Sequence, residues 1–205
     1  NSIIEAKDEN IKIIKNENTL LYQQLEDNNV ELAKYKNIIN SFNDMEIKNL
    51  DYVYYPIENL SISQQEYIQN LCWNNDLSYE YILAIMKAES QYDVNAISYD
   101  GSSMGIMQVQ EKYAKSWADM IGMKEYNLYD LEDNVKLGIA VLVNYRSYWQ
   151  DKGITDESLF YYMTESYNLG IGGLQKYIKE TGNIERGYSK TILEYKYDLE
   201  QIELN

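Results

Sequence analysis

Residues 79–89 read YEYILAIMKAE, and this stretch decides the class of fold that the sequence predicts. Ile82, Ile85 and Met86 recur with helical spacing, so they share one face of a helix that must turn toward a core. Glu89 follows at the same spacing and falls on the same face. The pattern therefore predicts an amphipathic helix whose last turn carries a carboxyl group on its apolar side.

A carboxyl group on an apolar face has two explanations. Burial raises its pKa, so that it keeps a proton near neutrality and can act as a general acid. Alternatively, Glu89 turns into solvent at the helix end or pairs with a lysine. Periodicity alone favours this second explanation, because charged side chains are seldom buried.

Capping signals mark the starts of this helix and of two others. Ser78 can cap the helix that ends at Glu89. Residues 63–66, SQQE, match a capping box, with Ile62 and Tyr67 placed to form a hydrophobic staple. Asp130 can cap a long helix that runs to about residue 148 with apolar residues along one face.

Two more helices follow toward the C-terminus. One opens at Asp156 or Ser158 and ends near Tyr167, with Gly170 after it. Residues 185–203 form a last amphipathic helix. These segments extend the helical pattern to the end of the chain.

Strand signals are scarce, and only residues 97–109 leave room for a short β-hairpin or an irregular loop. We therefore expect a mainly α-helical domain over residues 63–205. Residues 47–62 break the helical pattern and contain Pro56, the only proline in the sequence. This segment is the predicted linker.

Residues 1–46 carry a heptad pattern. One register places Ile4, Ile11, Asn18, Leu25, Leu32 and Ile39 at one core position, and Ile14, Leu21, Tyr35 and Phe42 at the other. Seven-residue spacing makes an apolar seam that one helix alone cannot bury. We expect a coiled-coil stalk through which residues 3–46 pair with a second copy or a partner helix. A single helix that folds back on the domain is the alternative.

The composition excludes several kinds of chemistry. The 205 residues include no histidine, which rules out Ser–His or Cys–His nucleophile pairs and imidazole ligands. The single cysteine, Cys72, rules out an internal disulfide and a multi-thiolate metal site, and is predicted to be a small buried residue. No cofactor or metal is therefore expected, and catalysis must use carboxyl groups, hydroxyls, amides or lysine.

The formal net charge is −15. It argues against nucleic acid as a partner and against adsorption to an anionic membrane surface. The sequence contains no apolar run of about 18 residues and no signal-peptide pattern, so no transmembrane segment is expected in this chain. The first residue is Asn1, which is consistent with a processed chain whose export signal lies upstream.

Three motifs in order resemble the soluble lytic transglycosylase (SLT) family. Residues 89–98, ESQYDVNAIS, followed by Gly101 and by residues 105–109, GIMQV, resemble the family's signature around its catalytic Glu-Ser. Residues 130–142, DLEDNVKLGIAVL, resemble its long central helix. Residues 165–170, ESYNLG, resemble its Ala-Tyr-Asn-x-Gly motif. The resemblance spans about residues 64–195 and implies a lysozyme-like helical fold.

The sequence departs from the family pattern at two places. Residues 102–104, SSM, make the turn between Gly101 and Gly105 one residue longer than the commonest family spacing. Ser166 stands where alanine is usual before Tyr-Asn. The first departure affects the expected shape of the loop, and the second exchanges one small residue for another.

The resemblance also implies a role for each matched residue. Glu89 corresponds to the catalytic acid, which protonates the glycosidic oxygen and then acts as a base. The residues that the resemblance places beside it or along the substrate groove are Ser90, Ser98, Met107, Gln108, Tyr167, Asn168 and Tyr188. By the residues themselves, Met107 is better explained as core, and Ser98 is equally suited to shaping a turn.

The implied substrate is peptidoglycan, and the implied reaction cleaves the β-1,4 bond between N-acetylmuramic acid and N-acetylglucosamine. The family uses one carboxyl group, because the C6 hydroxyl of the substrate closes a 1,6-anhydromuramyl ring. Such a substrate implies an extracellular or cell wall-associated protein.

Two other functions stay open at this point. A hydrolytic lysozyme-like or chitinase-like glycosidase needs a second carboxyl group, for which Asp93 and Asp100 are the nearest candidates. Of these, Asp93 is better explained as a local cap. A non-catalytic scaffold that only binds glycan is the third possibility.

Overall fold

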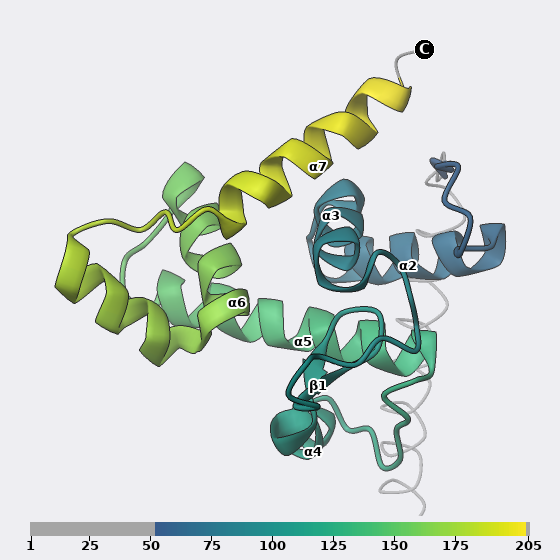
Figure 1. Ribbon diagram of the computed structural model, residues 1–205, viewed down its shortest axis with the longest axis horizontal. Coiled ribbons are helices and arrows are strands. Elements are labelled where there is room, and N and C mark those ends of the chain that lie inside the picture. The colour runs from purple at the N-terminus through teal and green to yellow at the C-terminus, as the bar shows by residue number, and fades with distance from the viewer. Residues whose placement is uncertain (1–51, 204–205) are drawn as a thin grey trace, which may run out of the picture. The chain divides into compact units, whose positions relative to one another are not determined.

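Six helices and one two-stranded hairpin make up residues 52–203, the part of the chain that the computed structural model describes (Figure 1). In chain order the elements are α2 (Ile62–Asn74), α3 (Tyr79–Ser90), β1 (Ser103–Met104), β2 (Val109–Gln110), α4 (Glu111–Met120), α5 (Leu131–Gln150), α6 (Asp156–Thr181) and α7 (Tyr188–Glu203). The prediction of a mainly helical domain with a short hairpin is confirmed. The predicted coiled coil and its pairing lie outside the described residues.

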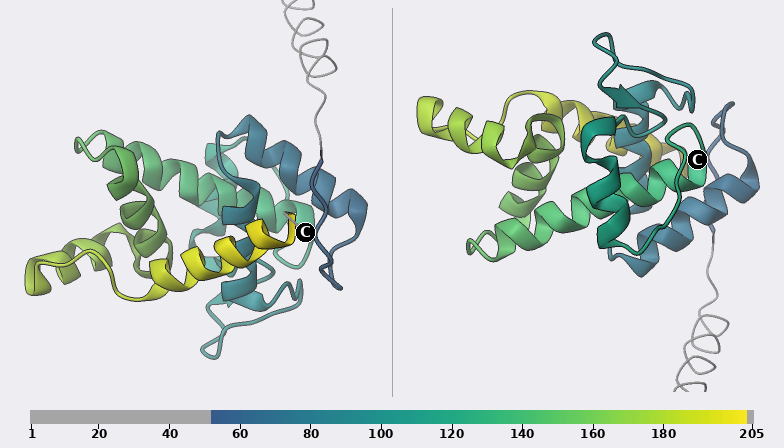
Figure 2. Two further views of the ribbon diagram at one scale, coloured as in Figure 1. Left: turned by 90° about the horizontal axis from the view of Figure 1, so that it is seen from above. Right: turned by 90° about the horizontal axis from the view of Figure 1, so that it is seen from below.

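Helix α5 is the long central element of this domain. It packs against α2, α4 and α6, and it also contacts β2 (Figures 1 and 2). Helix α3 lies against α2 and α7, and α6 packs on both α5 and α7. This order brings the end of α3, the hairpin and the start of α7 to the same region of the molecule.

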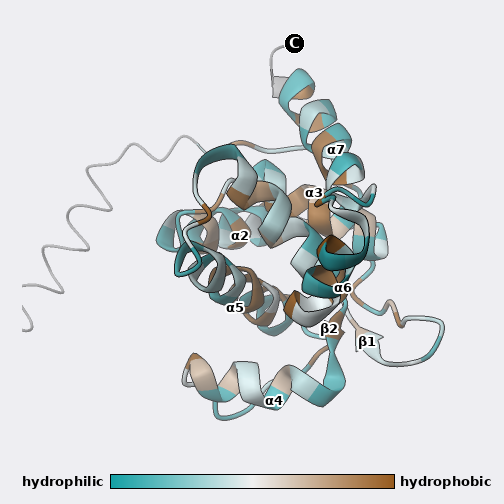
Figure 3. Cartoon of the chain, turned by 90° about the vertical axis from the view of Figure 1, so that its left-hand side faces the viewer, coloured by the Kyte–Doolittle hydropathy of each residue, from teal (hydrophilic) through white to brown (hydrophobic). Residues whose placement is uncertain are grey.

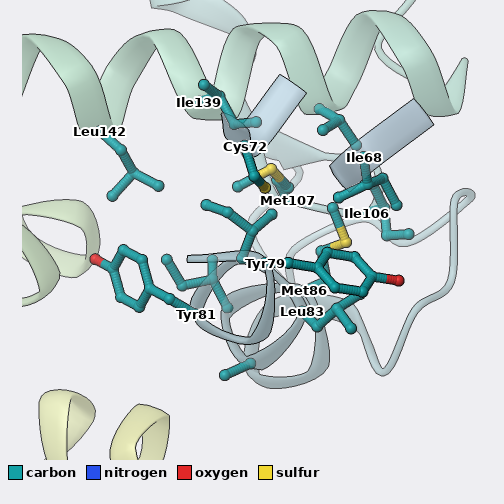
Figure 4. Packing of buried hydrophobic residues seen from close by; sticks show 14 of the residues in the cluster. Ile68, Cys72, Tyr79, Tyr81, Leu83, Met86, Ile106, Met107, Ile139 and Leu142 are labelled. Carbon is teal, nitrogen blue, oxygen red and sulfur yellow. The ribbon is translucent and has the colours of Figure 1, made fainter. Parts of the chain in front are cut away.

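The core is built around α3. The five consecutive residues 82–86 have no exposed surface, so this helix is enclosed on more sides than the predicted single face. Cys72 of α2 is also fully buried, as predicted, and lies in the same cluster (Figure 4). Figure 3 shows hydrophobic residues concentrated on α3 and along α5. Burying each such side chain contributes about 1.5–3 kcal/mol, which fixes α3 firmly.

The capping predictions have mixed outcomes. The side chains of Ser78 and Asp130 cap α3 and α5, as predicted. The capping box at residues 63–66 is wrong, because α2 begins earlier: Ser61 is the N-cap and Gln64 is its partner. Glutamine at the third helical position serves this motif as well as glutamate does. Ile62 is 62% exposed, so it forms no hydrophobic staple.

Residues 52–61 of the predicted linker pack against α2. The side-chain amide of Gln69 accepts from Val53 N and donates to Val53 O, both at 2.8 Å. Gln65 pairs with the backbone of Tyr55 in the same way, at 2.9 and 3.0 Å. Two side-chain amides one helical turn apart thus bond the backbone N–H and C=O groups of the extended segment, as a neighbouring strand would.

Three features of the later helices differ from their predicted outlines. Helix α4 was not predicted, because its 10 residues carry no capping side chain that bonds its start. Helix α6 begins at Asp156, one of the two predicted starts, but it does not end near Tyr167. It resumes after Gly170, whose φ of 71° and ψ of 158° interrupt the helical backbone. Helix α7 begins at Tyr188, three residues later than predicted.

Asn134, a buried residue of α5, attaches the hairpin loop to the helices. Its Oδ1 accepts from Met107 N at 2.8 Å, and its Nδ2 donates to Met104 O at 2.9 Å and Leu128 O at 2.8 Å. Gly105 lies directly above it with a φ of +78°. A Cβ atom on Gly105 would lie 2.2 Å from both Asn134 Nδ2 and Leu128 O. Only glycine fits this close approach.

We expect Gly105→Ala to lower the free energy of unfolding by about 3 kcal/mol or more, since it adds a steric overlap to an unfavourable backbone conformation. Gly101→Ala is the matched control, because Gly101 also has a positive φ but open space around its Cα. It should cost about 1 kcal/mol. Urea denaturation of both variants measures the difference, and equal losses would contradict the role of the close contact.

Candidate active site

Glu89 lies in the last turn of α3 and is half-buried. The preceding turn of the helix, with Ile85 and Met86, is fully enclosed. Burial raises the pKa of Glu89 above its ordinary value of 4.5, and a hydrogen bond from Tyr188 partly opposes this effect. The carboxyl group is thus bound to a phenol, and its pKa shifts in the direction that a general acid requires.

Tyr188, the first residue of α7, is the direct partner of Glu89. Its hydroxyl donates to Glu89 Oε1, across 99 residues of sequence. Burial and the neighbouring carboxyl group raise the pKa of Tyr188 well above 10, so the phenol keeps its proton and remains a donor. The hydrogen bond favours the charged form of Glu89.

Tyr167, on α6 just before the Gly170 break, is the second phenol of this site. Burial and the charge of Glu89 raise its pKa well above 10, which places it within electrostatic reach of that carboxyl group. Its hydroxyl donates to Met107 O at 2.8 Å and so ties α6 to the hairpin loop. Tyr167 is therefore held in a fixed position, and the charge of Glu89 acts on its phenol.

A hollow of about 240 Å³ opens beside Tyr167. Its lining combines aromatic rings with amides and one lysine: Gln108, Val109, Gln110, Lys112, Tyr113, Trp117, Val141, Tyr145, Tyr167, Leu169 and Gly170. Rings of this kind offer apolar faces to sugar C–H groups, and their hydroxyls suit sugar edges. The hollow is thus chemically suited to a carbohydrate.

A larger hollow, of about 380 Å³, lies between α2, α4 and α5. Its lining is mostly aliphatic, and no carboxyl group of the described chain contributes to it. Size therefore does not identify the reactive site. The smaller hollow is the better candidate because its lining is aromatic and polar and includes Tyr167, whose phenol is affected by the charge of Glu89.

Gln108 is a lining residue whose amide also shapes the loop. Its backbone has a φ of 50°, and its Nε2 donates to Ala96 O at 3.1 Å and Gly105 O at 2.9 Å. These bonds hold the loop against the hairpin. The side chain is therefore held in one orientation at the edge of the hollow.

Two of the predicted site serines bond the protein itself. The Ser90 hydroxyl is shared between Ile106 O at 2.8 Å and Met86 O at 3.1 Å, which ties α3 to the hairpin loop. The Ser98 hydroxyl donates to Asp100 Oδ1 at 2.7 Å and accepts from Ser103 N. Ser98 thus shapes the turn, one of the two roles expected for it.

The assignment of Met107 as a substrate-contacting side chain is wrong. The residue has no exposed surface and packs against Gly138 of α5, so only its carbonyl takes part in the site, through Tyr167. Asn168 is exposed, with its Oδ1 3.5 Å from Arg186 Nη1, and it does not line the hollow.

The two carboxyl groups that could serve as a second catalytic carboxyl group, Asp93 and Asp100, both accept hydrogen bonds within their own turns. Asp93 Oδ1 accepts from Asn95 N at 2.8 Å, the local role expected for it. Asp100 is exposed, and its Oδ1 accepts from the hydroxyl and the N–H of Ser102 and from Ser98. These hydrogen bonds lower the pKa of Asp100 to about 2. Neither aspartate is bonded to Glu89.

The sequence did not single out Trp117, Tyr113 or Glu165. The first two lie on α4, the helix that capping signals failed to mark. Trp117 meets Tyr145 of α5 edge-on at 6.3 Å, and Tyr145 could have been found, because it follows the apolar face of that helix. Glu165 was noticed only as part of a motif, although its side chain is fully buried.

Residues 52–203 contain no group of three or more potential ligands that could hold a metal ion. None of the helices in this part of the chain is long and apolar enough to cross a membrane.

Comparisons with known proteins identify the family and the fold of this domain. A family model described as the transglycosylase SLT domain matches residues 66–189. The fold is similar to that of an inactive mutant of the lytic transglycosylase Slt from Pseudomonas aeruginosa, with a TM-score of 0.58 and 21% identity over 70% of this chain and 25% of that one. No curated protein sequence gives a significant match.

Two further solved structures share the fold. The 70 kDa soluble lytic transglycosylase of Escherichia coli has a TM-score of 0.56 and 20% identity over 67% of this chain and 24% of that one. A complex of the 70 kDa soluble lytic transglycosylase with bulgecin A has a TM-score of 0.57 and 19% identity over 70% and 25%. This chain thus matches about a quarter of the length of those proteins.

The family model covers more than half of the chain and includes Glu89, Tyr167 and Tyr188. The resemblance seen in the sequence motifs is thereby confirmed. The chain belongs to the transglycosylase SLT domain family.

Proposed function

We propose that this domain is a peptidoglycan lytic transglycosylase that cleaves the β-1,4 bond between N-acetylmuramic acid and N-acetylglucosamine. The observation that carries the proposal is the state of Glu89: a half-buried carboxyl group that accepts a hydrogen bond from the phenol of Tyr188 and has a raised pKa. The aromatic hollow that Tyr167 lines adds a surface suited to a carbohydrate. Family membership supports peptidoglycan as the substrate class.

In the first step, protonated Glu89 donates its proton to the glycosidic oxygen. The C1–O bond breaks, the departing sugar keeps the electron pair together with that proton, and positive charge develops at C1 of the muramyl residue. Glu89 is then a carboxylate. The hydroxyl of Tyr188 stabilises this charged form through its hydrogen bond.

In the second step, the C6 hydroxyl of the same muramyl residue attacks C1. Glu89 takes the hydroxyl proton as the new C–O bond forms, which closes the 1,6-anhydro ring and returns the acid to its starting state. One carboxyl group serves both steps, and no water is consumed.

The positions of Asp93 and Asp100 favour this reaction over hydrolysis. Hydrolytic glycosidases place a second carboxyl group across the bond, about 5–9.5 Å from the first. Here both candidate aspartates bond to their own turns.

Peptidoglycan as substrate also places the protein, by our proposal, outside the cell or in the cell wall.

Glu89→Gln keeps the shape of the side chain and removes its proton, so we expect it to lower the rate of glycan cleavage by at least about 100-fold. Digests of purified wall sacculi, analysed by mass spectrometry, measure both rate and product. Wild-type products should be lighter by one water than hydrolytic products. Asp93→Asn is the matched control and should cleave normally, because its oxygen can still accept from Asn95 N. Hydrolytic products, or an active Glu89→Gln variant, would refute the proposal.

The rate should fall as pH rises through the raised pKa of Glu89, because only the protonated group can donate. Tyr188→Phe removes the hydrogen bond that favours the charged form, so the pKa of Glu89 rises further. The falling limb of the pH–rate profile should therefore move to higher pH in this variant. Initial rates on sacculi across the pH range test this, and a limb displaced to lower pH would contradict the assignment.

Glu89→Gln should also stabilise the fold at neutral pH. Since the folded-state pKa of Glu89 is raised, its contribution to stability is fully present below the unfolded value of about 4.5 and is lost as pH rises through the folded value. Thermal unfolding should therefore show a higher melting temperature for the variant at pH 7 and no difference near pH 4. An equal gain at both pH values would point to a cause other than this ionisation.

A further inference from the structure

Glu165, on α6, is a fully buried carboxyl group that the proposed reaction does not use. Its Oε1 accepts three hydrogen bonds, from Arg186 N at 3.1 Å, Ser189 N at 3.0 Å and Ser189 Oγ at 2.7 Å. Its Oε2 has no hydrogen-bond partner within the described part of the chain. Two of these donors belong to Ser189 in the first turn of α7, and the third, Arg186 N, lies two residues before the helix. Glu165 therefore binds the beginning of that helix from another element.

The start of α7 suits an acidic partner. The first N–H groups of a helix have no partner within the helix, and they carry a partial positive charge. The first turn of α7 contains no acidic residue of its own. Glu165 supplies the missing acceptor across the α6–α7 contact.

The residue that begins α7 is Tyr188, the donor to Glu89. Ser189, which bonds Glu165 through both its N–H and its hydroxyl, is the next residue. Two residues beyond Glu165 on its own helix is Tyr167, which donates to Met107 O of the hairpin loop at 2.8 Å. One buried carboxyl group thus joins α6 to α7 directly beside Tyr188, the phenol that donates to Glu89.

The rest of α7 is held in a different way. Ile192 and Leu199 are buried, and the helix packs along α3 (Figures 1 and 2). The chain just before α7 turns at Gly187, whose φ of 105° favours glycine. Apolar packing can therefore hold the helix as a whole, but it does not determine where the first turn lies. A buried carboxyl group also costs free energy that an apolar side chain would not.

We infer that Glu165 is a positioning residue, which fixes the first turn of α7 so that the hydroxyl of Tyr188 stays on Glu89. This inference rests on the proposed function and names a residue that acts through Tyr188. The titratable groups that face Glu89 are the phenols of Tyr188 and Tyr167. The nearest cationic group on α3, Lys87, lies over the ring of Tyr195, 4.2 Å from its centroid.

Glu165→Ala tests the inference. We expect the turnover rate to fall by about 100-fold with little change in KM, because a misplaced first turn removes a contact at the reacting group and leaves the hollow intact. The falling limb of the pH–rate profile should move to higher pH, in the same direction as in Tyr188→Phe. In a Tyr188→Phe background, Glu165→Ala should move the limb no further, since the same hydrogen bond is already lost.

Two variants serve as controls for a purely structural effect. Glu165→Gln keeps an oxygen that can accept from Ser189. Compared with Glu165→Ala, it should recover most of the turnover rate and the wild-type position of the falling limb of the pH–rate profile. Ser166→Ala, one residue along α6, removes the hydrogen bond from Trp149 Nε1 at 2.8 Å without touching α7. It should lower stability and leave the limb unchanged.

The outcomes separate the inference from the proposed function. A folded Glu165→Ala variant with a wild-type limb, alongside a displaced limb in Tyr188→Phe, overturns the role of Glu165 and leaves the transglycosylase proposal standing. Full activity in Glu89→Gln overturns the proposed function instead. If Glu165→Ala does not fold, Ser189→Ala takes its place, because it removes one of the three hydrogen bonds. A limb displaced to higher pH then supports the inference, and an unchanged limb overturns it.

Discussion

The arrangement of this domain depends on the burial of α3. Residues 82–86 have no contact with solvent, so the helix cannot shift without opening the core. The turn that follows carries Glu89, which is half-buried and bonded to Tyr188, to the edge of this core. There the carboxyl group loses hydration, and the same desolvation that disfavours its charge raises its pKa. Desolvation of Glu89 therefore lowers the stability of the fold, and it also gives the carboxyl group the raised pKa that an acid catalyst needs.

In the mechanism we propose, Glu89 also acts as a base, and burial alone would hold its proton too firmly for that. Tyr188 provides the opposing effect, because its hydroxyl donates to the carboxylate that forms when the proton leaves. Tyr167 donates instead to the Met107 carbonyl, so it orders the hairpin loop. Two phenols of similar type therefore have different tasks, set by the acceptor that each one reaches.

Local signals in the sequence predicted much of this. The spacing from Ile82 to Glu89 put Glu89 on the apolar side of its helix, although periodicity alone favoured a solvent-facing side chain, and the caps at Ser78 and Asp130 marked two helix starts. Failures arose where the local signal was ambiguous: residues 61–64 and 63–66 both have a serine followed three residues later by Gln or Glu. Met107 lies in a motif with groove residues, but the small Gly138 opposite leaves room for its side chain in the core.

The sequence by itself determined the helical class, the position of the acid on its helix and the absence of imidazole chemistry, because these follow from residue type and short-range spacing. Only the tertiary structure decided which phenol meets the acid, that Asp100 is held in its own turn, and that Glu165 binds the start of α7. The partners Tyr188 and Glu89 are 99 residues apart, and no local pattern encodes such a pairing. It arises from the packing of α6 and α7 against the fixed frame of α3 and α5.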